Sequence, residues 1–173
     1  MALRPGRLLF TLIALFTITG PYIADWNTTH VYNPSWPPHA KFHNGQTMSM
    51  GLYLGLAMLY YLYKPLSLPK HIQPSSSSSS SPSPSNSNSQ TYGEGMKKGD
   101  VEVLREAEKG NLMVVTVLAA MYWVTQLSAI LYPGSRAMDP EFGDGFPQLW
   151  IDLGCFAVIA WGNWLERGRI GGL

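Results

Sequence analysis

Charge is the property that this sequence has least of. Only 13% of its 173 residues are charged, whereas 46% are hydrophobic, and soluble proteins carry about 25% charged residues. The formal net charge of +1 leaves no surplus of Lys and Arg for phosphate backbones, which excludes a nucleic-acid partner. The shortage of charge indicates contact with lipid rather than with water.

Cysteine is almost absent as well. Cys155 is the only one, so no disulfide can form within the chain. It lies in an apolar run, which predicts a small packed side chain rather than a nucleophile.

Four long apolar runs are present, over residues 8–24, 47–63, 112–132 and 149–165. Each is close to the ~17–25 residues that cross a bilayer core. Backbone groups in lipid must be hydrogen-bonded within their own segment, so all four runs are expected to be helical. Aromatic residues gather near the ends of the runs, as they do at membrane interfaces. The sequence therefore predicts an all-α integral membrane four-helix bundle, with residues 1–173 as a single transmembrane domain.

The first run follows Arg4 and Arg7, a pattern that also describes a secretory signal peptide. Cleavage needs small residues at fixed positions, and no Ala-x-Ala site occurs around Gly20 or Ala24. An uncleaved helix is favoured, although the sequence leaves the retention of this span open. A soluble protein with four buried helices is the other alternative, and runs of membrane-spanning length with so few charges argue against it.

Basic residues set the expected orientation. With the N-terminus in the cytosol, ten of the twelve Lys and Arg residues lie on the cytosolic side, and only Lys41 and Arg136 lie outside. Cytosolic segments carry the excess of positive charge, so both termini are expected in the cytosol and the loops 25–46 and 133–148 outside. We expect a multi-pass protein of the endoplasmic reticulum membrane.

The connection between the second and third runs is polar. Residues 75–90, SSSSSSSPSPSNSNSQ, have nothing to bury, which predicts a disordered cytosolic Ser/Pro linker. After it, Asp100 can cap a short charged helix from Val101 to Lys109. The charges of both signs in that helix are expected to form a solvated face before the third run.

The outer segment 25–46, DWNTTHVYNPSWPPHAKFHNGQ, concentrates the groups that carry chemistry, because it holds three of the four histidines. Its prolines stiffen the backbone, so a structured outer loop is expected. Pro37 and Pro38 are expected to open a helix that continues into the second run. His39 and His43 then lie four residues apart on one helical face.

Two histidines at this spacing can bind a metal ion, with His30 or Asp25 as a third ligand. The pattern is weak without a Glu motif, so no cofactor is predicted, and the metal ion is kept as an alternative for His39 and His43. General acid–base use of one histidine and a structural or interfacial role also stay open.

Asp152 lies inside the fourth run, near its outer end. Ionisable residues within a span usually face the bundle interior or a polar cavity, and they are candidates for function. The candidate catalytic residues all fall at the outer leaflet, where they could line one polar pocket: Asp25, His30, His39, His43 and Asp152. The alternative is that Asp152 caps a helix or bonds across helices. The candidate substrate-binding residues are Trp26, Trp36, Gln46 and Gln126.

Further polar and small residues are better explained by packing. Gln126 and Asn163 lie deep in the third and fourth runs, where a hydrogen bond across helices is favoured. Thr47, Gly51 and Gly55 form a stripe of small residues, which predicts that another helix approaches the second run closely.

The string DWNTTHVYNPSWPPHAKFHNGQ resembles a family of small four-span membrane proteins of unknown function found in fungi and bacteria. Fungal members can occur among secondary-metabolism genes, and some carry an acetyltransferase label, although this sequence has no acyl-transfer motif. The resemblance covers the first two runs and their loop, and the serine tract departs from it. It implies that these positions matter: Asp25, Trp26, Asn27, His30, Asn33, Pro34, Trp36, Pro38, His39, His43 and Gln46.

Two classes of function follow. The first is a cofactor-independent acid–base enzyme, of isomerase, cyclase or hydrolase type, that acts on a lipophilic secondary metabolite. The second is a non-catalytic lipid-binding or metabolite-binding protein, or an accessory subunit of a membrane complex. Membrane lipid and a lipophilic small molecule are the expected partners, and homo-oligomerisation stays open. A transporter is third, because four helices without an internal repeat are few for alternating access.

Overall fold

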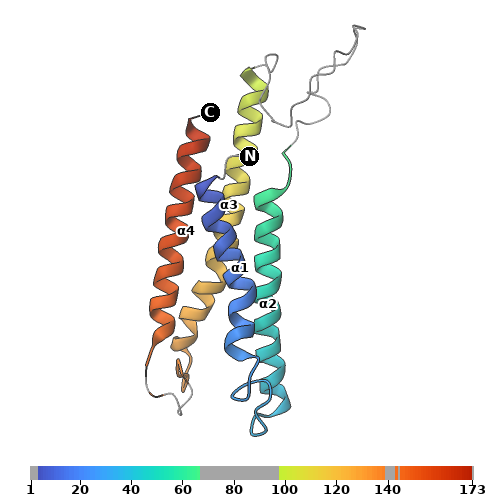
Figure 1. Ribbon diagram of the computed structural model, residues 1–173, viewed down its shortest axis with the longest axis vertical. Coiled ribbons are helices and arrows are strands. Elements are labelled where there is room, and N and C mark those ends of the chain that lie inside the picture. Colours follow the sequence, from blue (N-terminus) through green and yellow to red (C-terminus); the bar gives the residue numbers. More distant parts are fainter. Residues whose placement is uncertain (1–3, 67–97, 139–142, 144, 173) are drawn as a thin grey trace, which may run out of the picture.

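The computed structural model describes residues 4–66, 98–138, 143 and 145–172. This part of the chain forms four long α-helices that stand side by side in one bundle (Figure 1). They are α1 Pro5–Asp25, α2 Pro38–Tyr63, α3 Lys98–Ser128 and α4 Pro147–Gly171, and the 3-10 turn η1, Ala129–Leu131, extends α3. No strand occurs among the described residues, so the predicted all-α fold with four helices is confirmed. The predicted disordered linker, residues 75–90, lies outside the described residues.

The helices form a ring in which neighbours run antiparallel (Figure 1). Helix α1 lies against α2 and α4, and α3 lies against the same two helices, whereas α1 and α3 make only a few contacts. The described residues 26–37 and 132–138 lie at one end of the bundle, which we call the loop end (Figure 1). The start of α1 and the end of α4 lie toward the other end, the termini end, where α3 extends past α2. This is the up-and-down order that short connections favour.

Proline begins three of the four helices. Pro5, Pro38 and Pro147 are the first residues of α1, α2 and α4, where the missing N–H costs no hydrogen bond and φ is already helical. Helix α2 therefore runs without a break from the outer segment into the second apolar run, as Pro37 and Pro38 predicted.

The charged segment before the third apolar run differs from the prediction. Residues 101–109 are not a separate short helix, because they are continuous with the third run in α3. One side of the segment is buried, since Leu104 and Glu108 extend the buried stripe of Leu112 toward the termini end. The other side carries two ion pairs, the partly exposed Glu102–Arg105 pair and the exposed Glu106–Lys109 pair. The solvated face was thus predicted correctly for one side only, because a helix repeats its buried face every three to four residues.

Glycines on α2 allow α1 to approach closely. A Cβ atom on Gly55 would lie 2.7 Å from the carbonyl oxygen of Ala14, and one on Gly51 would lie 2.7 Å from that of Thr17. Real Cβ atoms do not come so near to backbone, so only glycine fits at these two positions. Thr47, the third residue of the predicted stripe, is exposed. The close contact therefore begins one turn further along α2 than the sequence predicted.

The core consists of apolar side chains that all four helices contribute along the bundle axis. Cys155 is buried among them as a free thiol, as predicted. The members of the core include Phe10, Ile13, Leu54, Met58, Val115, Trp123 and Ile159, which come from all four helices.

Two helices of the described chain are long and apolar enough to cross a membrane. They are α1 and the helix from Lys98 to Leu131, which joins α3 and η1. Helix α2 begins with a polar segment, and Asp152 and Asn163 lower the hydropathy of α4. The predicted spans are therefore supported for two helices, and the other two remain predictions.

Candidate functional site

Asparagine side chains shape the loop between α1 and α2. The Oδ1 atom of Asn27 accepts hydrogen bonds from the Thr29 backbone N–H at 2.9 Å, from the Thr29 hydroxyl at 2.8 Å and from the His30 N–H at 3.2 Å. The amide of Asn33 donates to the Thr29 carbonyl at 2.9 Å, and its oxygen accepts the Ser35 N–H at 2.9 Å. Such side-chain bonds to nearby backbone stabilise turns. The loop is therefore structured, as its prolines predicted.

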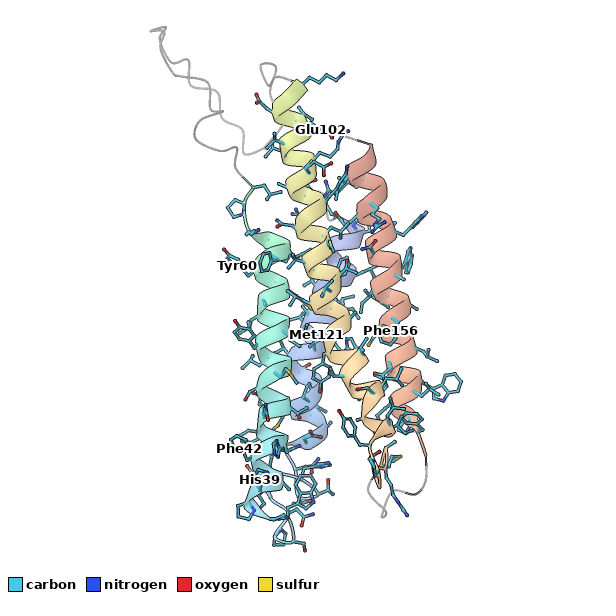
Figure 2. All side chains as sticks on the ribbon, turned by 180° about the vertical axis from the view of Figure 1, so that it is seen from behind. His39, Phe42, Tyr60, Glu102, Met121 and Phe156 are labelled. Carbon is cyan, nitrogen blue, oxygen red and sulfur yellow. The ribbon has the colours of Figure 1, made fainter. Side chains whose placement is uncertain are left out.

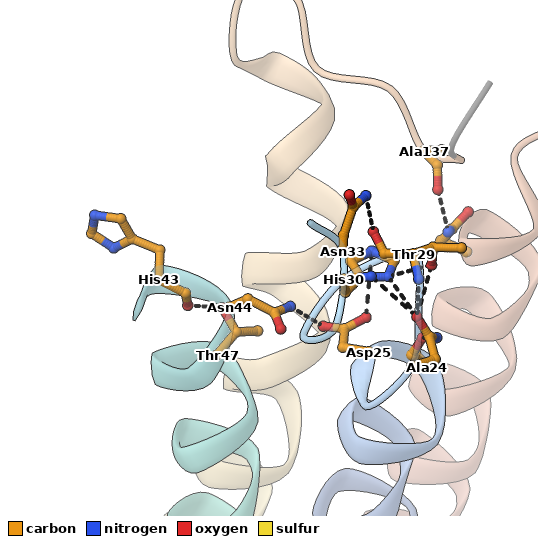
Figure 3. A network of polar contacts seen from close by, with 11 residues as sticks. Ala24, Asp25, Thr29, His30, Asn33, His43, Asn44, Thr47 and Ala137 are labelled. Carbon is orange, nitrogen blue, oxygen red and sulfur yellow. Dashed lines mark hydrogen bonds and ion pairs between the residues drawn. The ribbon is translucent and has the colours of Figure 1, made fainter. Parts of the chain in front are cut away.

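Asp25 is the centre of a group of residues at the loop end, which we call the loop cluster: Asp25, His30, Trp36 and Asn44. Figure 3 shows Asp25 with His30 and Asn44. Asn44 of α2 donates its amide to Asp25 Oδ2 at 2.8 Å, which ties the end of α1 to the start of α2. His30 Nε2 lies 3.9 Å from Asp25 Oδ1, and the His30 ring meets Trp36 edge-on with centroids 5.0 Å apart. Both Asp25 and His30 are about three-quarters buried, with side chains 21% and 24% exposed.

His39 and His43 form a separate pair on the surface of α2. Their Nε2 atoms lie 3.0 Å apart, and His43 Nδ1 lies 3.2 Å from Gln46 Oε1. The histidines share one helical face, as predicted, but both are exposed, and His43 points away from Asp25 (Figure 3). Phe42 stacks against His39 on the same stretch of α2 (Figure 2). Within the described residues, no three His, Cys, Asp or Glu side chains are grouped as metal ligands would be.

The tryptophans of the outer segment lie in different places. Trp26 is more than half exposed, stacks on Tyr22, and donates its indole N–H to the Tyr32 hydroxyl at 2.8 Å. Trp36 belongs to the loop cluster. Trp26 therefore lies at the rim of the loop end, and Trp36 lies beside His30.

Asp152 lies in the bundle interior, where no part of its surface is exposed. Neither carboxylate oxygen has a hydrogen-bond partner within the described chain. The hydroxyl of Thr17, the indole N–H of Trp123 and the side-chain oxygen of Gln126 are also buried without a partner there. Buried polar groups are almost always hydrogen-bonded, so such a group of exceptions on three helices marks a candidate site. We call Thr17, Tyr122, Trp123, Gln126 and Asp152 the interior cluster.

Tyr122 connects the interior cluster with the loop cluster. Its phenol lies within electrostatic range of both Asp152 and Asp25. Its ring meets Trp123 edge-on at 5.2 Å, and it lies against Gly51, where a Cβ atom would come within 3.3 Å of the ring. A larger residue at Gly51 would displace this ring. The sequence did not single out Tyr122, although it precedes Gln126 by four residues and so shares its helical face.

A buried ion network occupies the termini end, and we define it as Glu108, Glu166 and Arg169. Arg169 donates Nε to Glu166 Oε2 at 2.7 Å, and its Nη2 lies 3.1 Å from Glu108 Oε2. Both glutamates are less than a tenth exposed. Burial lowers the pKa of the Arg169 guanidinium, but the hydrogen bonds and negative charges of Glu166 and Glu108 raise it by more. The network joins α3 to α4.

This network was not predicted, because Glu108 was assigned to a solvated face. A signal was present, since Glu108 precedes Leu112 by four residues and therefore falls on the buried stripe of α3. The expected packing role of Asn163 does appear, because its amide donates to the Thr116 hydroxyl at 2.7 Å across α3 and α4.

The predicted site residues are thus divided among three places. Asp25 and His30 come together in the loop cluster, His39, His43 and Gln46 lie on the surface of α2, and Asp152 and Gln126 lie inside. Only the interior cluster combines a titratable group, full burial and unpartnered polar atoms. A carboxyl group can exchange a proton with a bound molecule, and a phenol can hydrogen-bond to it.

The geometry defines an all-helical bundle with a buried polar site. A family model described as a family of unknown function (DUF6640) matches residues 9–80 and 101–173. The chain belongs to this family, which confirms the resemblance to an uncharacterised family. The unmatched residues 81–100 include the second part of the serine tract. No curated protein and no solved structure matches the chain.

Proposed function

We propose that the protein is a four-span membrane protein whose interior cluster transfers protons within a lipophilic small molecule. The proposal that the protein spans a membrane is based on the composition of the outer surface of the bundle. Residues 8–24, 47–63, 112–132 and 149–165 contain one charged residue, Asp152, and it is fully buried. The outside of all four segments is therefore free of charge. Every helix also exposes large apolar side chains there, including Leu12, Tyr60, Met121 and Trp161. Figure 2 labels Tyr60 and Met121 among them. In water such a surface would aggregate, whereas lipid solvates it.

The proposed orientation places the loop end outside and the termini end in the cytosol, because ten of the twelve Lys and Arg residues lie on the termini side of the four segments. Labelling of single cysteines tests it in a Cys155→Ser background. A membrane-impermeant maleimide should label Gly172→Cys in sealed microsomes with the cytosolic face outward. Thr28→Cys should react only after detergent is added. Equal labelling of both sites before detergent would refute the four-span arrangement, and the reverse pattern would refute the orientation.

Full burial of Asp152 without a hydrogen-bond partner is the observation that carries the functional proposal. An unpartnered carboxyl group in an apolar interior is costly, and such groups inside a span are functional candidates. Trp123 of the interior cluster stacks on Phe16 with ring centroids 5.2 Å apart, so the cluster combines polar groups with apolar rings and suits an apolar molecule with one polar group. Asp152 would bind that group and exchange a proton with it.

Isomerisation is the simplest reaction that these residues support. The Asp152 carboxylate would remove a proton from a carbon next to a carbonyl group and return it to another carbon of the same molecule. The Tyr122 hydroxyl would donate a hydrogen bond to the carbonyl oxygen, on which negative charge develops. No atom is gained or lost, so neither oxidant nor co-substrate is needed.

Asp152→Asn tests the proposal, because it keeps the size of the side chain and removes the proton exchange. Lipophilic extracts of cells that produce either chain are compared by mass spectrometry for pairs of compounds with equal mass. Conversion should fall at least about 100-fold in the variant, the usual size of a general acid–base contribution. Asn163→Ala is the control, since it removes another polar group within the fourth apolar run, one that is partly buried and donates to Thr116. Circular dichroism and gel filtration in detergent verify that both variants fold.

Non-catalytic binding of a lipophilic molecule is the second candidate. It is favoured by the exposed position of His39 and His43, which leaves the interior cluster with one carboxyl group and no histidine. In that case wild-type protein would retain a lipophilic compound through purification and Asp152→Asn would lose it, with no isomer pair in any extract. An unchanged isomer ratio together with unchanged retention would exclude Asp152 from either role.

A further inference from the structure

A small cavity of ≈ 40 Å³ opens at the termini end, far along the helices from the interior cluster. Its polar lining comes from all four helices and the residue after α2. By the same measure one water needs about 10–15 Å³, so the cavity has room for about three waters or for one compact polar group. The charged and amide side chains that line it are Arg7, Lys64, Glu108, Asn111, Glu166 and Arg169.

The lining carries an unbalanced positive charge. It holds three cations, Arg7, Lys64 and Arg169, against two carboxylates, Glu108 and Glu166, which leaves +1. Arg169 is paired with both carboxylates, which leaves the ion network with a charge of −1, whereas Arg7 and Lys64 together contribute +2. The surplus therefore lies on the side of Arg7 and Lys64.

Neither of these two cations forms a close ion pair with a carboxylate in the described part of the chain, although Arg7 lies within electrostatic range of Glu166 and Glu108. Arg7 makes no ion pair and no side-chain hydrogen bond there, although it is only partly exposed. Lys64 lies over the Tyr61 ring, with Nζ 4.3 Å from the centroid, which orients the ammonium group without neutralising it. A partly buried guanidinium and an ammonium beside one cavity favour an anion, because charge-assisted bonds to oxygen anions are strong.

We propose that this cavity binds a phosphate group, held by Arg7 and Lys64 with the Asn111 amide as a further donor. A guanidinium offers two parallel N–H groups that match two phosphate oxygens, and an ammonium adds a point charge. The composition of the lining supports the assignment, since four of its six charged and amide side chains carry N–H donors. The phosphate belongs either to an anionic lipid, whose chains would lie along the apolar surface, or to a soluble phosphate compound.

Binding of two probes distinguishes these sources. The first is inorganic phosphate, added to purified protein in a neutral detergent and followed by the unfolding temperature. The second is phosphatidic acid, incorporated into phosphatidylcholine nanodiscs and followed by native mass spectrometry of retained lipid. Binding of both probes indicates a site open to soluble phosphates. Binding of phosphatidic acid alone indicates a lipid site.

Variants tie the binding to the cavity. The double variant Arg7→Gln/Lys64→Gln should weaken binding of the effective probe at least about tenfold, because it removes both charge-assisted contacts. Arg7→Lys keeps the positive charge but loses the two parallel N–H groups of the guanidinium. Its affinity for the probe should therefore lie between those of the wild type and the double variant. Arg167→Gln removes a positive charge from an exposed position next to Glu166 and should leave binding within about twofold.

Three results would overturn the proposal. They are binding of neither probe to the wild type, equal binding by the wild type and the double variant, and an equal loss in Arg167→Gln. The last would show that the general positive charge of this end attracts the anion. None of these results bears on Asp152, because Arg7 and Lys64 lie outside the interior cluster. The phosphate site and the proposed proton transfer are therefore tested independently.

Discussion

The two ends of the bundle hold their polar residues in different ways. At the loop end, amide and hydroxyl groups satisfy the backbone of a proline-stiffened turn, and Asp25 accepts a hydrogen bond from the neutral amide of Asn44. At the termini end, full charges are buried and paired with each other, as Arg169 is with Glu108 and Glu166. The loop end is thus held mainly by neutral hydrogen bonds, and the termini end by charge.

This difference has an energetic consequence. A neutral hydrogen bond contributes about 1 kcal/mol, and its loss is local. A buried ion pair contributes little net free energy when intact, but removal of one partner leaves a charge without compensation and costs about 3–5 kcal/mol. A single substitution at the termini end should therefore cause a large loss of stability, whereas a single substitution at the loop end should cause a small one.

The largest effect is expected from Arg169→Ala, which leaves two buried carboxylates close to each other. We expect the free energy of unfolding to fall by about 3 kcal/mol, at the lower end of the range because a quarter of the Arg169 side chain is exposed. Titration from a mild detergent into SDS, followed by circular dichroism, measures it. Arg169→Lys keeps the charge and should lose clearly less. A loss below about 1 kcal/mol for the alanine variant would show that the two ends do not differ in this way.

An intermediate effect is expected from Asn27→Ala at the loop end. The substitution removes the acceptor for three hydrogen bonds from Thr29 and His30, so the turn should lose about 1–2 kcal/mol of local stability. Amide hydrogen exchange should accelerate at these two residues while the SDS midpoint changes little.

Thr28→Ala is the matched control for Asn27→Ala, because this neighbour is exposed in the same turn. Its exchange should equal that of the wild type. If Asn27→Ala instead shifted global unfolding as much as Arg169→Ala, the loop would be part of the cooperative core rather than a locally held cap.

Sequence reasoning succeeded where contacts are local. Pro38 begins α2 because of its fixed φ, and Gly51 and Gly55 mark the close approach of α1 because their spacing follows the helical repeat. The structured outer loop was predictable for the same reason, since its prolines and asparagines act on residues two to four positions away.

It failed where partners lie far apart in the chain. Glu108 and Arg169 are joined across α3 and α4, and no local pattern indicates which of several glutamates meets an arginine 61 positions later. The same limit applies to Tyr122, which lies within electrostatic range of both Asp25 and Asp152 only because of how three helices are rotated about their axes. Asp152 itself could be recognised from the sequence, because a carboxylate within an apolar run is unusual whatever its neighbours in space are.

The smallest effect is expected from an ion pair of the same chemistry that lies on the surface of the termini end. Glu106 and Lys109 lie at the termini end with Oε1 and Nζ 2.6 Å apart, a shorter distance than in the Arg169–Glu108 pair, but both side chains are more than half exposed. Water screens an exposed pair, so Glu106→Ala should change the free energy of unfolding by less than about 0.5 kcal/mol. A double-mutant cycle of Glu106 with Lys109 should give a similarly small coupling energy, and a cycle of Glu166 with Arg169 a coupling several times larger. If the two coupling energies were equal, burial would not strengthen an ion pair in this protein. The termini end would then be stabilised by the apolar contacts around the ion network instead.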